Sequence, residues 1–311
     1  MKVCFFGLGS IGTRHCLNLR KICEEAGIPL EIHALRSSHR PTREALKQIP
    51  IRDLYSPAEM DERYDAIFIT NPTALHYETL RQTGDRSRYF FIEKPVFENE
   101  DEDLSKLPLA TDAVIYVAAP LRYTRVIREA RAFVKEHRIY SARAISSSYL
   151  LDWRPGQDYR QTYSARKELG GGVSIDLIHE WDYLSLLFGT PKRVYSMMGR
   201  YSELEIDSDD LAVYIAEYEN CLAEVHLDYF GRKTRRELEL YTKAGCWVFD
   251  IAHACVTAPD GRTEQYPEEA NEKYLQEMRY FLSLILEKAT TSENTISHAC
   301  EVLRITKGAA R

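Results

Sequence analysis

The sequence predicts an α/β protein with two domains: a doubly wound parallel sheet over residues 1–119, and an α+β domain with an open, mainly antiparallel sheet over residues 120–311. In the first part, short apolar runs with strand character alternate with stretches of helical spacing, which is the pattern of βαβ units. In the second part, strand-like runs follow one another closely and are separated by turn signals, as in antiparallel sheets. A length of 311 residues suits two such domains.

The first domain is predicted from five apolar runs that are rich in strand-forming residues. Four of them are followed directly by glycine-rich or polar residues. Ligands bind beyond the carboxyl ends of the strands in a sheet of this kind, so these four ends are the first candidates for a site. The five runs are 2–6, 30–35, 66–70, 89–92 and 114–118.

The second domain is predicted from a different order of elements. Strand-like runs lie close together, with turns such as Glu219-Asn220 between them, while helical spacing is confined to the start, the middle and the end. The C-terminal helix can pack back on the first domain. Strands are expected over 142–150, 193–200, 210–219, 221–228, 236–242 and 246–250, and helices over 122–136, 173–188, 271–288 and 295–307.

The composition excludes several classes of protein. A net charge of −6 argues against a nucleic-acid-binding surface, and the sequence has no apolar run long enough to predict a membrane span. Seven scattered cysteines contain no C-x-x-C pair, so we expect reduced thiols and no zinc site. With no signal-peptide pattern at the N-terminus, the sequence predicts a cytoplasmic protein.

Residues 7–12 carry the strongest single motif. They read Gly-Leu-Gly-Ser-Ile-Gly, which fits G-x-G-x-x-G, and they stand between a strand and a helix. In this context Gly7 permits a tight turn, Gly9 lets a pyrophosphate approach the backbone, and Gly12 lets the helix pack closely on the strand. The free N–H groups at the helix start, around Ser10 and Ile11, favour an anion. The motif predicts a Rossmann domain that binds NAD or NADP.

The residues after the second strand indicate which dinucleotide is preferred. An acidic residue at this point hydrogen-bonds the ribose 2′-hydroxyl of NAD, but the sequence has Arg36, Ser37 and Ser38 instead. A guanidinium and two hydroxyls suit a 2′-phosphate. NADP is therefore predicted over NAD, with an exposed arginine and dual cofactor use as the alternative.

The fourth apolar run ends in Glu93-Lys94-Pro95, where Lys94 is placed beyond the carboxyl end of a parallel strand. A lysine there can give or take the proton that accompanies hydride transfer, because burial and neighbouring charge shift its pKa readily. Pro95 fixes the backbone that follows, and a cis bond before it is a minority outcome for X-Pro.

A second polar motif follows the triple glycine of residues 170–172. On one helix, Asp176, His179 and Asp182 lie three apart and form a polar stripe. An imidazole between two carboxylates is held in one orientation and suits general acid–base work. An ordinary solvated face is the alternative. No third ligand accompanies Asp176 and His179, so no metal is predicted.

Taken in order, these motifs resemble the Gfo/Idh/MocA oxidoreductase family over nearly the whole chain. The set consists of the glycine loop, Thr70-Asn71-Pro72 with His76, Glu93-Lys94-Pro95, and the triple-glycine helix. The resemblance implies a Rossmann domain and a C-terminal domain whose open sheet forms the interface of a homodimer or homotetramer. It also implies substrates that are sugars, amino sugars, inositols or nucleotide-linked sugars.

Residue by residue, the resemblance assigns Lys94 to the lysine that contacts the reacting hydroxyl, His179 to the general acid–base, and Asp176 to its acidic neighbour. Thr70, Asn71, Pro72, His76 and Glu93 join the residues expected to bind the cofactor. Many members of the family have four positions between this aspartate and histidine, whereas the offset here is three. We prefer His179 if only one of the two is catalytic.

The substrate is expected to contact the segment that precedes the triple glycine. Its aromatic rings can stack on sugar faces, and its arginines can hold a carboxylate or phosphate, which favours an acidic or phosphorylated sugar. A loop packed by its own aromatic side chains is the alternative. The expected substrate-binding residues are Arg122, Tyr123, Trp153, Arg154, Tyr163, Arg166, Asp176 and His179.

The sequence therefore predicts an NAD(P)-dependent dehydrogenase that interconverts a hydroxyl and a ketone on a sugar-like molecule. One alternative is a dinucleotide-binding sensor without activity on the same fold, since fold does not fix function. Another is redox-neutral glycoside cleavage through a transiently oxidised sugar.

Overall fold

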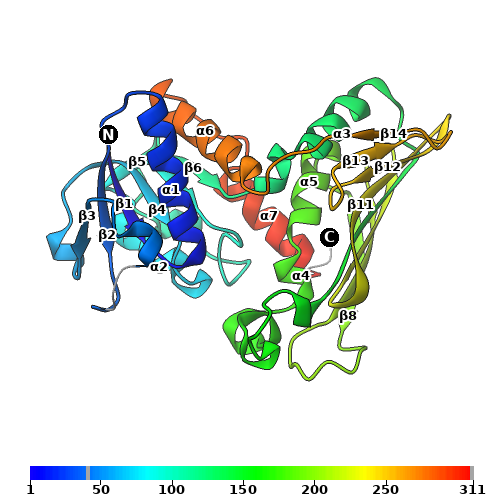
Figure 1. Cartoon of the computed structure of the whole chain (residues 1–311), viewed down its shortest axis with the longest axis horizontal. Coiled ribbons are helices and arrows are strands. Elements are labelled where there is room, and N and C mark those ends of the chain that lie inside the picture. Colours follow the sequence, from blue (N-terminus) through cyan, green and yellow to red (C-terminus); the bar gives the residue numbers. More distant parts are fainter. Residues whose placement is uncertain (40–42, 309–311) are drawn as a thin grey trace. The chain divides into compact units, whose positions relative to one another are not determined.

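The computed structural model describes residues 1–39 and 43–308, and the chain divides into two compact units (Figure 1). Unit 1 contains Met1–Pro120 and Asn271–Cys300, and unit 2 contains Leu121–Ala270 and the residues from Glu301 onward. The first division lies one residue from the predicted boundary. The second shows that a C-terminal segment of the chain returns to unit 1.

Unit 1 is built on a six-stranded sheet in the order β3-β2-β1-β4-β5-β6, in which all neighbouring strands are parallel. The order reverses between β1 and β4, the point at which a doubly wound sheet leaves a crevice for a ligand. The sequence did not predict β3, which is short and has two adjacent charged residues, Arg52 and Asp53, at its centre. The strands are β1 (Lys2–Phe6), β2 (Glu31–Leu35), β3 (Ile51–Leu54), β4 (Tyr64–Ile69), β5 (Ser87–Ile92) and β6 (Val114–Val117).

The helices of unit 1 are α1 (Ser10–Glu25), α2 (His76–Thr83) and the returning α6 (Glu272–Leu286). α1 packs beside α6 (Figure 1), and the start of α6 is joined to the middle of α1 by a hydrogen bond of 2.8 Å that Asn271 Nδ2 donates to Asn18 Oδ1. α6 also carries Glu277, a fully buried carboxylate. It accepts hydrogen bonds from Tyr116 Oη at 2.9 Å and from the backbone N–H of Ala119 at 2.6 Å. The returning helix is therefore bonded to β6 and the residues after it.

Unit 2 is built on an eight-stranded sheet in the order β14-β13-β12-β11-β7-β10-β9-β8. Its neighbouring strands are antiparallel except for β7 and β10, which are parallel, so the predicted mainly antiparallel sheet is correct. The short β13 and β14 were not predicted. The strands are β7 (Ser141–Tyr149), β8 (Arg193–Gly199), β9 (Leu211–Glu217), β10 (Leu222–Asp228), β11 (Phe230–Thr242), β12 (Gly245–Asp250), β13 (Cys255–Thr257) and β14 (Thr263–Gln265).

The helices α3 (Arg125–Glu136), α4 (Val173–Asp176) and α5 (His179–Phe188) cover one face of this sheet (Figure 1). The last helix, α7 (Ile296–Thr306), runs from the residues of unit 1 into those of unit 2. Its end lies against β9, since Tyr214 Oη donates a hydrogen bond of 2.6 Å to the carbonyl of Thr306. Across the described residues, no helix combines the length and apolar character needed to cross a membrane.

Candidate functional site

Gly7 and Gly12 are required by the packing of unit 1 itself. Gly7 follows β1 with a φ of +93°, and a Cβ added there would lie 2.8 Å from the carbonyl oxygen of Thr70. A Cβ at Gly12 would lie 2.2 Å from the carbonyl oxygen of Gly7, so α1 can pack against the loop only if residue 12 has no side chain. These are the roles that the motif predicted for the two positions.

Gly9 differs from its two neighbours, because no protein atom lies within 4 Å of a Cβ built there. The open space adjoins the start of α1. The first backbone bond of that helix is donated by Thr13 to the carbonyl of Gly9, so the N–H groups of residues 10–12 have no acceptor in the helix. The first turn holds no acidic residue. This combination of free space, free donors and a helix dipole suits a pyrophosphate.

A cleft of about 570 Å³ opens at the reversal point of the sheet, and we call it the β1/β4 cleft. It brings together predicted residues from the ends of β1, β2 and β4. Arg43 and Glu78 also line it, although no sequence signal marked them. Its lining residues are Phe6, Gly7, Leu8, Gly9, Leu35, Arg36, Ser37, Ser38, Arg43, Tyr55, Asn71, Pro72, Leu75, Glu78, Thr79 and Gln82.

Arg36 lines this cleft as an ion-paired side chain. Its Nη1 donates hydrogen bonds of 3.1 and 3.0 Å to the two carboxylate oxygens of Asp53, on β3, and the side chain is 12% exposed. The carboxylate holds the guanidinium at the cleft and also offsets part of its charge. The sequence could not reveal this partner, because it lies on a strand that was not predicted.

Thr70 and Asn71 connect the end of β4 to the glycine loop. Thr70 is buried, and its Oγ1 donates to the carbonyl of Gly7 at 2.5 Å. Asn71 Nδ2 donates to Thr79 Oγ1 at 2.9 Å, while its Oδ1 is buried with no hydrogen-bond partner among the described residues. A buried carbonyl oxygen without a donor at the cleft fits a bound group that supplies a hydroxyl or amide.

His76 is a buried residue that holds two loops together. Its Nε2 lies 3.0 Å from the carbonyl of Asn71, and its Nδ1 lies 3.1 Å from the carbonyl of Val96. Burial lowers the pKa of this imidazole despite the carbonyl oxygens around it. His76 therefore holds the loop at Asn71 against the loop at Val96, and its contact with the cofactor stays a prediction.

Glu93 is tied to the glycine-loop helix by a residue that the sequence analysis missed. His15 of α1 is fully buried, and its Nε2 lies 2.5 Å from Glu93 Oε1. Burial opposes the charge on Glu93, but the hydrogen bond to His15 and the charges of His15 and Lys94 outweigh it and lower its pKa. The Lys94-Pro95 bond is cis, and Lys94 is half-buried beside this carboxylate. Since 78 residues separate His15 from Glu93, no local pattern could link them.

In unit 2, Asp176 lies in a cluster of aromatic and acidic side chains. Tyr229 Oη donates a hydrogen bond of 2.6 Å to Asp176 Oδ2, and the Tyr229 ring packs edge-on against Trp153 at 5.2 Å. Burial and then the charges of Asp176 and Asp209 raise the pKa of Tyr163, which keeps that phenol neutral. Two predicted substrate residues, Trp153 and Tyr163, thus lie near Asp176.

Asp209 is a member of this cluster that the sequence did not indicate. Its Oδ2 accepts a hydrogen bond of 2.9 Å from the backbone N–H of Ser174 at the start of α4, and a Cβ at Gly172 would lie 2.2 Å from its Oδ1. Burial, and to a smaller extent the charge of Asp176, raises the pKa of Asp209. The triple glycine therefore lets an acidic side chain reach the backbone next to Asp176.

The predicted stripe of Asp176, His179 and Asp182 on one helix is not observed. Leu177 leaves helical geometry at φ −98° and ψ 29°, so Asp176 ends α4 and His179 begins α5. Asp182 is buried and accepts bonds of 2.8 and 2.7 Å from Nε and Nη2 of Arg122. Asp182 is therefore bonded to Arg122 and does not flank His179 on a shared helical face, whereas the substrate contact of Arg122 stays a prediction.

The remaining substrate candidates lie in or near the segment before the triple glycine. Arg154 is exposed, and Arg166 is half-buried with its Nε donating to the carbonyl of Arg160 at 3.0 Å. Trp153 Nε1 donates to Ser148 Oγ at 2.9 Å, while Tyr123 is half-buried after the first helical turn of unit 2. Part of this segment is thus held by its own bonds, and Arg154 is exposed to solvent.

One grouping with metal-ligand spacing occurs among the residues that the structure describes, in unit 1. Ligand atoms of Glu31, His33 and Asp61 lie within 4.8 Å of one another. The ammonium of Lys2 is hydrogen-bonded to Asp61 and lies 3.9 Å from Glu31. Its positive charge offsets the negative charge of these carboxylates, which a metal cation would need. We assign no metal to this group.

Comparison with known proteins decides the family. Residues 1–111 match the model described as "Oxidoreductase family, NAD-binding Rossmann fold", and residues 127–248 match the "GFO/IDH/MocA C-terminal domain". The two matches together span most of the chain. The protein belongs to the Gfo/Idh/MocA family.

Two curated relatives are named as dehydrogenases of different molecules, an inositol and a sugar. The chain is 23% identical to a myo-inositol 2-dehydrogenase of Thermotoga maritima over 61% of the chain and 55% of that protein. It is 24% identical to a D-xylose 1-dehydrogenase (NADP(+)) of Haloferax volcanii over 46% of the chain and 43% of that protein. The aligned parts thus span about half the length of these curated relatives.

A solved structure shares the whole fold. Levoglucosan dehydrogenase, in complex with NADH and levoglucosan, superposes with a TM-score of 0.83 at 18% identity, over 99% of this chain and 95% of that one. The likeness confirms the predicted fold, a Rossmann domain followed by a mainly antiparallel α/β domain.

Proposed function

We propose that this protein is an NAD(P)-dependent dehydrogenase that interconverts a hydroxyl and a ketone on a sugar, amino sugar, inositol or nucleotide-linked sugar. The observation that carries the proposal is the open space at Gly9 beside the uncapped start of α1, in a cleft at the reversal point of the sheet. The inositol and xylose dehydrogenases among the relatives support the substrate class.

The chemical roles follow from the residue types. The dinucleotide supplies or accepts the hydride when it is bound. We assign to Lys94, after β5, the contact with the reacting hydroxyl, and to His179, at the start of α5, the transfer of its proton. Asp176 has a supporting role, and Tyr229 positions it through the bond of 2.6 Å.

We further propose that NADP is preferred over NAD. Arg36, Ser37, Ser38 and Arg43 line the end of the β1/β4 cleft that follows β2, and together they offer two cations and two hydroxyls. Asp53 opposes this preference by pairing with Arg36. Since one relative is NADP-dependent and the solved structure holds NADH, the family includes both choices.

The substrate side of the proposal rests on the aromatic rings of Trp153 and Tyr163 near Asp176. Flat rings suit the apolar faces of a sugar, and the exposed Arg154 can hold a carboxylate or phosphate. An acidic sugar that inhibits more strongly than its neutral counterpart supports this contact. Equal inhibition by the two would remove Arg154 from the site.

A homodimer or homotetramer is proposed from the uncovered face of the sheet in unit 2. On this face Tyr195 and Met197 of β8 and Ile215 of β9 are 66%, 73% and 51% exposed. Apolar side chains gathered in this way mark an association surface. Light scattering should report a mass of two or four chains. The cytoplasmic location stays a prediction.

The test of the function has two stages. Fluorescence titration with NADPH and NADH should show saturable binding, tighter for NADPH, and Gly9→Ala should abolish it while leaving the melting temperature unchanged. Arg36→Ala should weaken the binding of NADPH and leave the binding of NADH unchanged.

In the second stage, a panel of sugars and inositols is screened for a change in cofactor absorbance. Absence of dinucleotide binding would end the proposal. Product formation with no net change in cofactor absorbance would instead support redox-neutral glycoside cleavage.

A further inference from the structure

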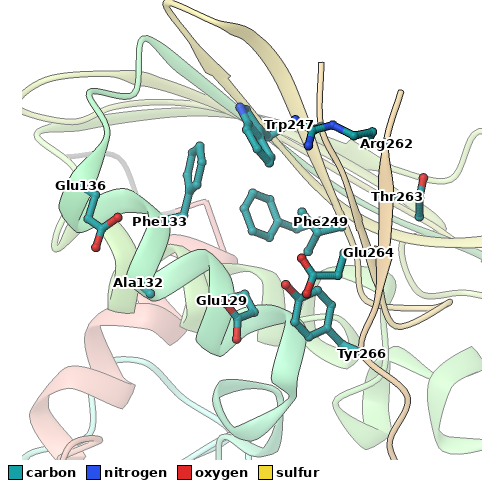
Figure 2. A pocket seen from close by; sticks show the side chains of 12 residues that line it. Glu129, Ala132, Phe133, Glu136, Trp247, Phe249, Arg262, Thr263, Glu264 and Tyr266 are labelled. Atoms are coloured by element: carbon teal, nitrogen blue, oxygen red, sulfur yellow. The ribbon is translucent and has the colours of Figure 1, made fainter. Parts of the chain in front are cut away.

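A second cavity lies wholly within unit 2, away from the predicted site residues. Figure 2 shows it between α3 and the edge of the sheet that β12, β13 and β14 form. Its volume is about 480 Å³, which is enough for a small organic molecule. The side chains that line it are Glu129, Ala132, Phe133, Glu136, Trp247, Phe249, Val256, Ala258, Arg262, Thr263, Glu264 and Tyr266.

Aromatic rings form the wall of this cavity on two sides. Phe133 projects from α3 toward Trp247 and Phe249 of β12, with ring centres 5.0 and 5.5 Å apart and planes inclined by 49° and 64° (Figure 2). Tyr266 lies on another side, just after β14. The His137 ring stacks on one face of Phe133, with ring centres 4.0 Å apart. Phe133, Trp247 and Phe249 are inclined to one another and do not stack fully, so part of their remaining surface is available. The face of each ring carries partial negative charge.

Three carboxylates surround the rings. Glu129 and Glu136 come from α3 and Glu264 from β14, and all three are exposed. Within residues 1–39 and 43–308, none of the three has an ion-pair partner. The cation that lines the cavity, Arg262, is bound to Asp260 through a contact of 2.7 Å from Nε to Oδ2. The walls therefore carry an excess of negative charge.

This excess of negative charge affects the pKa of Tyr266. Burial, the hydrogen bond with Glu264 and the charges of Glu129 and Glu264 raise its pKa to about 12, and the nearby cation Arg125 reduces the effect only in part. An anionic ligand would meet unfavourable charge here. A neutral ligand would gain no electrostatic attraction from the three carboxylates.

We propose that this cavity binds an organic ammonium ion, a protonated amine or a quaternary ammonium. Such a ligand combines an apolar surface, which the four rings can cover, with a diffuse positive charge that attracts both ring faces and carboxylates. A bare inorganic cation has no apolar surface for the rings. The proposal is independent of the oxidoreductase function, because no residue assigned to that function lines the cavity.

The test compares choline with 3,3-dimethylbutan-1-ol, which has the same shape without the charge. Calorimetric titration of the full-length protein should give saturable choline binding, with the neutral alcohol bound at least about tenfold more weakly. The double variant Glu129→Gln and Glu136→Gln should weaken choline binding severalfold, and Trp247→Leu should weaken it about three- to thirtyfold. The double variant Glu62→Gln and Glu203→Gln, which changes two exposed glutamates outside the cavity, is the charge-matched control and should change nothing.

Each remaining outcome overturns the proposal. Equal binding of choline and the alcohol removes the role of charge, and the absence of saturable choline binding at millimolar concentration removes the site. Choline binding that survives both the glutamine and the leucine variants belongs elsewhere on the protein. The glutamine variants alter only exposed side chains, so they keep the test valid if Trp247→Leu does not fold, which circular dichroism will show.

Discussion

The β1/β4 cleft of unit 1 and the Asp176 cluster of unit 2 are built in different ways. The cleft is shaped by backbone: a glycine with positive φ, a glycine that admits a helix, and the free N–H groups of α1. The Asp176 cluster is shaped by side chains that come from distant parts of the chain, such as Tyr229 and Asp209. A backbone-built site needs a particular residue at each position, whereas a side-chain cluster depends on which partners the fold brings together.

The difference extends to buried charge. In unit 1, His15 and Glu93 pair next to the residues expected to bind the cofactor. In unit 2, Arg122 pairs with Asp182 and Arg236 with Glu180, and these pairs fix α5 against its surroundings. The following four predictions test whether the cleft acts through its shape and the cluster through its charges, starting from the largest effect.

Replacement of His179 should have the largest consequence. If this imidazole transfers the proton, His179→Gln lowers kcat by about 10²–10⁴-fold, the usual contribution of a general acid–base. NADPH binding by fluorescence should be unchanged. His253→Gln, an exposed histidine, is the control. A kcat within threefold or so of wild type would transfer the role to Lys94 or Asp176.

Removal of Asp182 should be the largest change in stability. Asp182→Ala removes the carboxylate that pairs with the buried Arg122 guanidinium, which costs about 3–5 kcal/mol. Denaturant unfolding of unit 2 measures the loss. Asp260→Ala breaks an exposed aspartate–arginine pair and should cost less than about 1 kcal/mol. Similar losses in the two variants would mean that Asp182 is well solvated.

Alanine at Gly12 and at Gly9 should separate packing from binding. Gly12→Ala forces a Cβ against the carbonyl of Gly7 and should destabilise unit 1 by about 1–3 kcal/mol. Gly9→Ala meets no protein atom and should change stability by less than about 0.5 kcal/mol. Both should impair NADPH binding. Equal destabilisation by the two would contradict the open space at Gly9.

The smallest effect is expected from the pH dependence of Glu93. Since folding lowers the pKa of this carboxyl, its stabilisation is fully present above the ordinary value of 4.5 and is lost as pH falls through the lower folded value. Glu93→Gln removes this contribution of about 1.5 kcal/mol. Unfolding curves at neutral pH should therefore differ between wild type and variant, and should converge only once the pH has fallen below the lowered folded pKa of Glu93. Parallel curves across that range would show that Glu93 is not ionised in the folded protein.

Much of unit 1 could be predicted because local sequence determines it. The glycine loop, the strand ends at Asn71 and Lys94 and the parallel order follow from short motifs and from alternation of strands and helices. β3 could not be predicted, since an edge strand of four residues carries little hydrophobic pattern. His15 and Asp53 were missed for a further reason, because each acquires its role only through a partner on another element.

The segment from Asp176 to Asp182 in unit 2 shows where a prediction from residue spacing fails. A period of three to four residues predicted that Asp176, His179 and Asp182 share a polar face. Glu180 and Asp182 are instead both buried, each bonded to an arginine on another element. Nothing in the local pattern distinguishes a charged residue with a buried partner from one in solvent.

The returning helix α6 affects how the chain is made. Glu277 accepts hydrogen bonds from Tyr116 and Ala119, yet more than 150 residues separate it from them along the sequence. A ribosome that has finished the sixth strand has not yet made this carboxylate, and must first translate the eight-stranded sheet. The main segment of unit 2, Leu121–Ala270, is therefore synthesised while unit 1 still lacks α6. The NAD-binding half is begun first during translation, and its packing is completed near the end.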